Sequence, residues 1–235
     1  MIKRVTLSLL FSLLLPVTVF AAGPVLDNKA NGVNTNPVST SYTVGTGANR
    51  FLALFINADG GNLTVTSAPT YNGVAMIQSK AVTGNTNWGA AYSYYLVAPA
   101  TGANTLAFQM SGSGFSYTIY SFTNALQTQA GMASASINSG AGGQTMTLTT
   151  LANNSIGIGQ LSGSSQGGTG FVNDVITQNA GDQKAGYSNV SSVSTGITFT
   201  SGSQAEGTAM EIGEAPAAPS IATSLLGIVR AIWMF

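Results

Sequence analysis

One short segment matches a pattern that is known for catalytic nucleophiles. Gly163-Ser164-Ser165-Gln166-Gly167 has the G-x-S-x-G spacing that places a serine on a sharp turn between a strand and a helix. Such a serine needs a histidine base, and the chain contains neither histidine nor cysteine. No S-x-x-K motif offers a lysine base instead. We therefore interpret 163–167 as a Gly/Ser loop and predict no catalytic residue.

The seven carboxylates are the remaining candidates for acid–base chemistry or metal binding. They are Asp27, Asp59, Asp174, Asp182, Glu206, Glu211 and Glu214. A glycoside hydrolase needs two carboxylates across a cleft, but six of the seven lie near expected turns, loops or termini. Asp59 precedes Gly60-Gly61-Asn62, but without a D-x-D-x-D pattern ordinary turn chemistry explains it better than a calcium loop. The sequence predicts no metal site, no cofactor and no enzyme activity.

Aromatic side chains offer a better basis for ligand binding than reactive groups do. Trp88, Tyr92 and Tyr94 lie close together in the sequence, with Asn85 and Asn87 as polar neighbours. On a strand, Tyr92 and Tyr94 share one face, and exposed aromatic rings can stack against sugars. The alternative is that this face belongs to the hydrophobic core, where aromatic rings bury a large area. These five residues are the candidate ligand-binding site.

Charge and composition exclude one class of partner. Only 6% of the residues are charged, whereas 44% are hydrophobic. Without Lys3 and Arg4, which belong to the predicted signal peptide, five basic residues remain against seven acidic ones. No basic patch is available to neutralise a row of phosphates, so we predict no nucleic-acid binding.

The first 21 residues are typical of a secretory signal peptide. Lys3 and Arg4 precede an apolar run at 5–15, Pro16 ends the run, and Ala21 closes a small-residue cleavage site. The alternative is an uncleaved membrane anchor, but the run is short for a span of about 20 residues. We predict an exported protein that is extracellular or associated with the cell surface. Because it has no cysteine, packing and hydrogen bonds must stabilise it without disulfides.

The apolar runs between residues 22 and 214 are short and rich in β-branched and aromatic residues, which predicts strands. Residues 51–56 are continuously apolar, as expected of a central strand buried on both faces, and Asn72-Gly73 predicts a tight turn. The other expected strands are 74–82, 90–97, 105–110, 115–122, 145–151, 155–161, 171–176, 184–190, 197–199 and 208–212. Their spacing predicts one all-β domain at 22–214, an antiparallel β-sandwich of jelly-roll or Ig-like type.

A faint internal echo relates the two halves of this domain. Ala48-Asn49-Arg50 and Ala152-Asn153-Asn154 each precede an expected strand and, further on, a Gly-Gly pair. Two half-barrel units would explain the echo. In so biased a composition, chance similarity is the simpler explanation.

The amino-acid composition of the chain changes after residue 214. Residues 215–220 form an Ala/Pro linker, and residues 221–235 are apolar except for Thr223, Ser224 and Arg230. The segment is short for a membrane span, and Arg230 would be costly at mid-bilayer. Three interpretations stay open: a short apolar helix docked on a membrane or partner, a sorting or assembly tail, and a helix packed on its own sandwich.

Three segments carry a resemblance to known exported proteins. They are residues 41–50 (SYTVGTGANR), 71–76 (YNGVAM) and 94–105 (YYLVAPATGANT). With Ala209-Met210-Glu211-Ile212 as a closing strand, they resemble a loosely defined group of exported β-sandwich modules of bacterial surface proteins and phage-associated proteins. The resemblance covers residues 35–214 and implies a sandwich fold and an extracellular location. It contains no catalytic motif, so it implies no active-site residue.

The sequence as a whole predicts a non-enzymatic exported surface protein. We expect a structural or adhesion-type interaction module that is tethered through residues 221–235. Its expected partner is a glycan or a component of the cell envelope, and its oligomeric state stays open. A carbohydrate-binding module and a phage or virion surface protein are the alternatives, because a sandwich fold alone does not decide between functions.

Overall fold

The computed structural model describes most of the chain between residues 23 and 217. The described residues are 23–33, 35–58, 63–85, 89–129, 132–139, 143–162, 167–169, 172–176, 183–190, 196–202 and 205–217. The predicted signal peptide with Ala21, the loop 163–166 and the tail 221–235 lie outside them. Gly23–Ala215 form one compact unit. In this part of the chain no helix is long and apolar enough to cross a membrane.

The first half of the unit forms two antiparallel sheets. Their strands are β1 (Val25–Val33), β2 (Val38–Val44), β3 (Phe51–Ala58), β4 (Val65–Tyr71), β5 (Val74–Ala75), β6 (Ile77–Asn85), β7 (Gly89–Val97), β8 (Gly102–Met110) and β9 (Phe115–Thr123). The order β1-β9-β3-β7-β6 forms the sheet that we call inner sheet 1, and β2-β8-β4-β5 forms outer sheet 1. Together they are the first sandwich.

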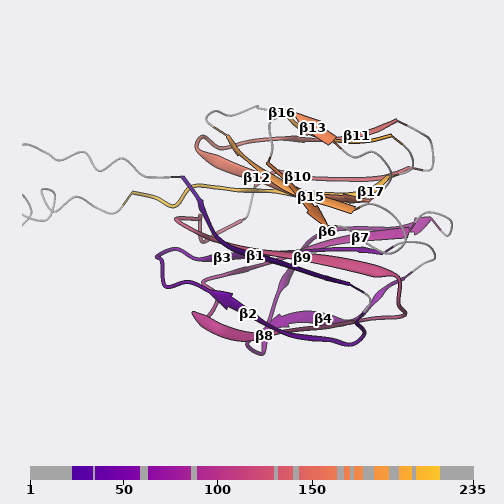
Figure 1. The fold of residues 1–235 in the computed structure, drawn as a ribbon. Helices are drawn as coiled ribbons and strands as arrows, with labels where there is room; N and C mark the ends of the chain where they lie inside the picture. The colour runs from indigo at the N-terminus through magenta and orange to yellow at the C-terminus, as the bar shows by residue number, and fades with distance from the viewer. Residues whose placement is uncertain are drawn as a thin grey trace, which may run out of the picture. The chain divides into compact units, whose positions relative to one another are not determined.

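The second half forms two further antiparallel sheets. Their strands are β10 (Ser134–Ser139), β11 (Gln144–Thr149), β12 (Ser155–Ser162), β13 (Gly167–Thr169), β14 (Val172–Ile176), β15 (Gln183–Val190), β16 (Gly196–Ser201) and β17 (Ala205–Ile212). The order β10-β17-β12-β15-β14 forms inner sheet 2, and β11-β16-β13 forms outer sheet 2. Together they are the second sandwich. Figure 1 shows the four sheets as layers, with the inner sheets in the middle.

The second sandwich repeats the strand order of the first. Strands β10, β17, β12, β15 and β14 occupy the places of β1, β9, β3, β7 and β6, and β11-β16-β13 repeats β2-β8-β4. Phe51 begins the first central strand, and Ile156 occupies the same place in the second. Asn49 and Asn154, two residues earlier in each case, share a φ of 50°. The internal sequence similarity, which we called an echo, therefore corresponds to a structural repeat of the two sandwiches.

The register of the repeat differs from the register of the sequence echo by one residue. The echo aligns Ala48 with Ala152, whereas the strand pairing and the matching backbone angles align Asn49 with Asn154. A shift of one residue exchanges the two faces of a strand. The weak sequence similarity thus locates the second copy but assigns its buried faces incorrectly.

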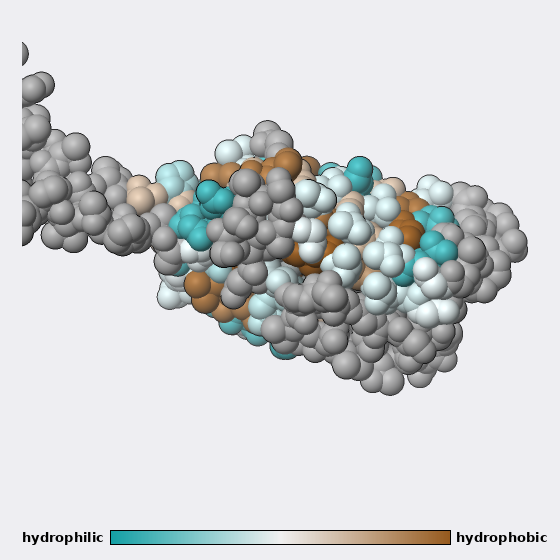
Figure 2. All heavy atoms as spheres, turned by 90° about the horizontal axis from the view of Figure 1, so that it is seen from above, coloured by the Kyte–Doolittle hydropathy of each residue, from teal (hydrophilic) through white to brown (hydrophobic). Residues whose placement is uncertain are grey.

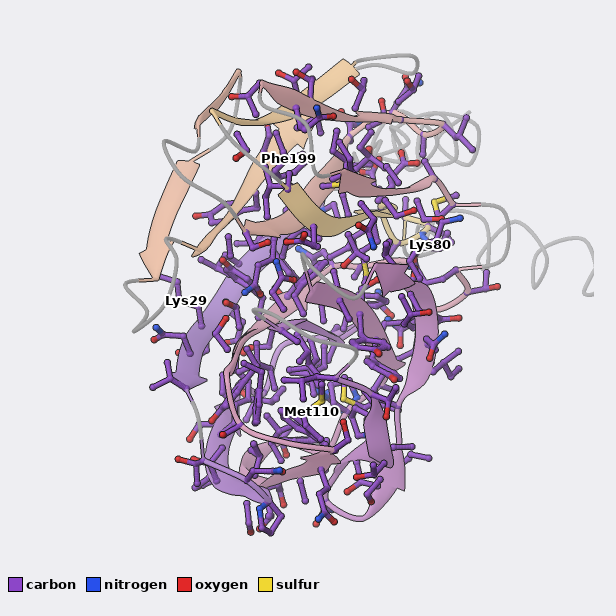
Figure 3. All side chains as sticks on the ribbon, turned by 90° about the vertical axis from the view of Figure 1, so that its right-hand side faces the viewer. Lys29, Lys80, Met110 and Phe199 are labelled. Atoms are coloured by element: carbon purple, nitrogen blue, oxygen red, sulfur yellow. The ribbon has the colours of Figure 1, made fainter. Side chains whose placement is uncertain are left out.

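Three apolar layers hold the four sheets together. The first layer lies inside the first sandwich, and the third lies inside the second sandwich around Phe199. The middle layer joins the inner sheets, with Phe51 and Phe55 packed in one cluster with Ile156 and Ile158. All eight residues of β3 are buried, which confirms the prediction of a central strand buried on both faces. Figure 3 shows Met110 and Phe199 in the cores of different sandwiches.

The middle layer has an apolar end and a polar end. Toward the polar end, Ser93 and Thr118 lie opposite Phe55 in the neighbouring strands, and Asn57 follows Phe55 along β3. Their side chains are buried, as is that of Thr208 in β17. Their side-chain oxygens Asn57 Oδ1, Ser93 Oγ, Thr118 Oγ1 and Thr208 Oγ1 have no hydrogen-bond partner among the described atoms. Because unsatisfied buried polar atoms cost free energy, the apolar end must supply the stabilisation of this interface.

The outer face of outer sheet 2 is polar but uncharged. Thr145 and Thr147 of β11 lie opposite Thr200 and Thr198 of β16. Figure 2 looks onto this side of the molecule, where pale residues of intermediate hydropathy lie beside brown hydrophobic patches. The exposed side chains of Thr145 and Thr147 agree with the low charge of the sequence.

The strand predictions fail where the strands are polar or short. The prediction misses β1, β2, β4, β10 and β13. The described exposed positions of β2 and β10 carry only Ser and Thr, and β13 is three residues long. The expected strand at 74–82 is split at Met76 into β5 in outer sheet 1 and β6 in inner sheet 1. The turn at Asn72-Gly73 is confirmed, with φ values of 51° and 74°. The chain thus crosses between sheets directly after this turn.

Glycine lets side chains of outer sheet 2 approach the backbone of β12. A Cβ atom on Gly159 would lie 2.9 Å from Ala209 Cβ and 2.9 Å from Phe199 Cζ. We expect Gly159→Ala to lower the free energy of unfolding by about 1–3 kcal/mol because of overpacking. Gly196→Ala is the matched control, since its Cβ would lie 3.6 Å from Thr147 Cγ2. Urea denaturation measures both, and equal stabilities of the two variants would contradict the packing.

Candidate binding groove

A groove of about 470 Å³ lies on the first sandwich, with walls from outer sheet 1 and inner sheet 1. On the outer-sheet side, β4 contributes Val65 and Ala68, and Thr64 lies just before it. On the inner-sheet side, β6 contributes Gln78 and Thr83. The rest of the lining is Met76, Tyr92 and Tyr94. All of these side chains are uncharged at neutral pH.

Irregular strand pairing shapes both walls of the groove. The register of β4 against β8 shifts between Val65 and Ser67 and again between Ser67 and Thr70. Pro69 lies inside the second shift and cannot donate a ladder hydrogen bond. Opposite, the register of β6 against β7 shifts between Val82 and Asn85. Bulges of this kind bend strands and redirect side chains, which places Ala68 and Thr83 at the groove.

Two tyrosines and one methionine form the floor of the groove. Tyr92 and Tyr94 are each 5% exposed, and Met76 is 6% exposed. The Tyr92 hydroxyl donates to the Leu63 carbonyl oxygen at 2.8 Å, and the Tyr94 hydroxyl donates to Gln78 Oε1 at 3.2 Å. Burial raises the pKa of Tyr92 and raises the pKa of Tyr94 to about 12, with the neighbouring Tyr92 as a smaller cause. Both hydroxyls therefore stay protonated at neutral pH.

The structure describes the side chains of two of the five predicted site residues, Tyr92 and Tyr94. Tyr92 and Tyr94 point into the first sandwich, so their rings form a recessed floor and not an exposed platform on the strand. Asn85 ends β6, but its side chain is not described, and Asn87 and Trp88 lie outside the described residues. Binding of a ligand by these five residues stays a prediction.

Sequence reasoning missed the walls of the groove. Thr64, Val65, Ala68, Met76, Gln78 and Thr83 were not among the predicted site residues. The available signal was Pro69 within a run of Thr, Ser and Ala that otherwise alternates poorly. A proline there indicates a bulged or edge strand, but it does not say what the bulge faces.

Three described carboxylates have structural roles. Glu211 is fully buried, and its carboxylate accepts hydrogen bonds from the backbone N–H groups of Ala133, Leu151 and Ala152. The Ser162 hydroxyl donates to Glu206, which is also buried. Asp27, Glu206 and Glu211 lie in strands, although the sequence suggested turns or termini for most carboxylates. Among the described residues no three carboxylates form a group that could hold a metal ion.

Asp27 joins β1 to two neighbouring segments of the first sandwich. Its carboxylate accepts a hydrogen bond from the Ser121 hydroxyl at 2.7 Å and another from the Gly45 N–H at 2.8 Å. The Tyr42 hydroxyl lies 3.1 Å from Ser121 Oγ. These bonds hold the start of inner sheet 1 against the end of β2, away from the groove.

Comparison with known proteins identifies no relative of this chain. Protein-family models, curated proteins and solved structures give no match to the chain. The resemblance to exported β-sandwich modules therefore stays a prediction from the sequence.

The buried tyrosines predict a loss of stability at high pH. Burial is the main cause that raises the pKa of Tyr42, Tyr92, Tyr94 and Tyr117 above 10.0. Because the pKa is higher in the folded state, their contribution is complete below pH 10 and is lost as the pH rises toward 12 and beyond. We expect the free energy of unfolding from urea titrations to be flat up to about pH 9 and then to fall. The free energy of unfolding of the Tyr94→Phe variant should fall less steeply. A free energy of unfolding that stays constant up to pH 12 would contradict the burial of these tyrosines.

Proposed function

We propose that the chain is a non-enzymatic exported surface protein, an interaction module tethered through its C-terminal segment, residues 221–235. The placement of the groove relative to the chain ends carries this proposal. Ala215 N–H donates to the Asn124 carbonyl oxygen, next to the place where β9 ends and β3 begins. Tyr92 pairs with Ile56 near the other end of β3. The groove therefore lies toward the end of the sheets that is remote from Ala215.

The two ends of the described unit also lie near each other. Asn154 Nδ2 donates to Glu214 Oε2 at 3.0 Å, and a Cβ on Gly23 would lie 2.6 Å from the Asn154 carbonyl oxygen. A module whose ends meet on one side can be attached there and present the other side to a partner.

The strand order supports assignment of both sandwiches to the jelly-roll type rather than the Ig-like type. In the first sandwich, β1-β9-β3-β7 faces β2-β8-β4-β5, and the second sandwich repeats this order without a counterpart of β5 among its described strands. Jelly rolls place eight strands in two sheets of this kind. The fold is shared by proteins with many functions, so the proposal rests on the placement of the groove and ends.

Deletion of residues 221–235 tests the tether. We expect the full chain, expressed in a bacterial host, to fractionate with the cell envelope, and the truncated chain to appear in the soluble exported fraction. Arg230→Ala is the control, because it removes the charge but keeps the apolar segment. Thermal melting of the truncated chain shows whether Gly23–Ala215 still folds. Envelope association of the folded, truncated chain would refute the tether.

A further inference from the structure

We propose that the groove on the first sandwich is a binding site for neutral glycans. The inference rests on the proposed function, because it names the ligand class of the interaction module. The site consists of a Tyr92/Tyr94 floor, an apolar wall from β4 and neutral polar side chains on β6. The groove volume of about 470 Å³ lies within the range of small-molecule sites, roughly 300–1,000 Å³.

Comparison of the two sandwiches shows that the fold does not require the two tyrosines. Strand β15 occupies the place of β7, and the register aligns Tyr92 with Lys184 and Tyr94 with Gly186. By contrast Tyr95, on the opposite face, aligns with Tyr187, and both pack against the middle layer. The aromatic residues on the groove side are therefore particular to the first sandwich, whereas the tyrosine on the interface side is common to both.

The chemistry of the lining matches a sugar ring. A pyranose has apolar C–H faces and a rim of neutral hydroxyls, so it needs aromatic or aliphatic surface together with uncharged hydrogen-bonding groups. Val65, Ala68 and Met76 supply aliphatic surface beside the tyrosine rings. Thr64 and Thr83 supply hydroxyls that both donate and accept hydrogen bonds.

Gln78 is the polar lining residue that is best placed to form a hydrogen bond with a ligand. It is exposed, and the Tyr94 hydroxyl donates to its Oε1 atom, which orients the amide. The NH₂ group of this oriented amide would donate a hydrogen bond to a sugar hydroxyl. A charged ligand fits poorly, because the lining residues offer no opposite charge to compensate for its desolvation.

Isothermal titration calorimetry on the exported full-length chain tests the proposal. The probes are the neutral hexasaccharides of cellulose, amylose, xylan and mannan, with polygalacturonate as a charged polymer. We expect at least one neutral probe to bind with a Kd of about 1 mM or tighter, and polygalacturonate not to bind. Gln78→Ala should weaken this binding about tenfold, since one hydrogen bond to the ligand is lost. Gln109→Ala, an exposed glutamine of β8 outside the groove, is the matched control and should change the Kd less than about twofold.

The outcomes separate this inference from the proposed function. No binding of any neutral probe, preferential binding of polygalacturonate, or an equal Kd for Gln78→Ala and the unchanged chain would each overturn the glycan site. If envelope association still depends on residues 221–235 in that case, the tether stands and only the groove assignment fails. If the glycan binds as expected but the truncated chain stays with the envelope, the groove stands without the tether.

Discussion

Replacement of Glu211 by alanine is expected to lower the free energy of unfolding by about 3–5 kcal/mol. The Glu211 carboxylate is fully buried and receives the N–H groups of Leu151 and Ala152, which lead into β12, and of Ala133, which leads into β10. Alanine would leave these three donors without their acceptor. Because the bonds join the starts of two strands to β17, the loss should destabilise the whole second sandwich. Guanidinium denaturation at neutral pH measures it.

Two further variants make this result specific. Glu211→Gln keeps one acceptor oxygen and should lose about half as much stability. Glu214→Ala removes a carboxylate that bonds to the exposed Asn154 and should cost about 1 kcal/mol or less. A Glu211→Ala variant within about 1 kcal/mol of the unchanged protein would show that the buried carboxylate does not hold these segments.

Replacement of Phe122 by alanine is expected to lower the free energy of unfolding by about 3–5 kcal/mol and to leave a single unfolding transition. Phe122 is fully buried in the middle layer, where its ring centroid lies 6.3 Å from Tyr120 and 6.3 Å from Tyr187 of the other sandwich. The cavity would remove apolar contact from both inner sheets at once. Both sandwiches should therefore lose stability together.

Val74→Ala provides the control for Phe122→Ala. Val74 is 53% exposed on the short strand β5, so its truncation should change stability by less than about 0.5 kcal/mol. Circular dichroism and tyrosine fluorescence should report the same midpoint for Phe122→Ala. Two separate transitions would mean that the sandwiches fold independently and that the middle layer contributes little.

The sequence predicts those elements whose pattern has one physical interpretation. The continuous apolar run of β3 favours a strand buried on both faces, and Asn72-Gly73 favours a tight turn. Leu106, Phe108 and Met110 alternate with Thr105, Ala107 and Gln109, and the three large apolar side chains are buried. Strands such as β1 could not be predicted, because most of its residues stay exposed or half-buried and show no apolar period. Pairing with β9 determines that it is a strand.

The groove depends on features that lie outside any local pattern. Residues 74–82 have the composition of a single strand, but Met76 lies where the chain crosses from outer sheet 1 to inner sheet 1. The alternation that puts Tyr92 and Tyr94 on one face can be predicted from the sequence, whereas the irregular pairing of β4 around Pro69 cannot. The role of Glu211 cannot be predicted from the sequence, because its three donors come from segments distant in sequence.

Methionine methyl NMR of the exported chain during titration with the bound hexasaccharide tests the glycan groove most directly. Met76 is part of the groove floor, whereas Met146 and Met210 lie in the cores of the second sandwich and of the middle layer. We expect the Met76 methyl resonance to shift with saturation while those of Met146 and Met210 stay in place. A shift confined to Met146 or Met210, or no shift at Met76 when the sugar is bound, would contradict the assignment of the groove as the site.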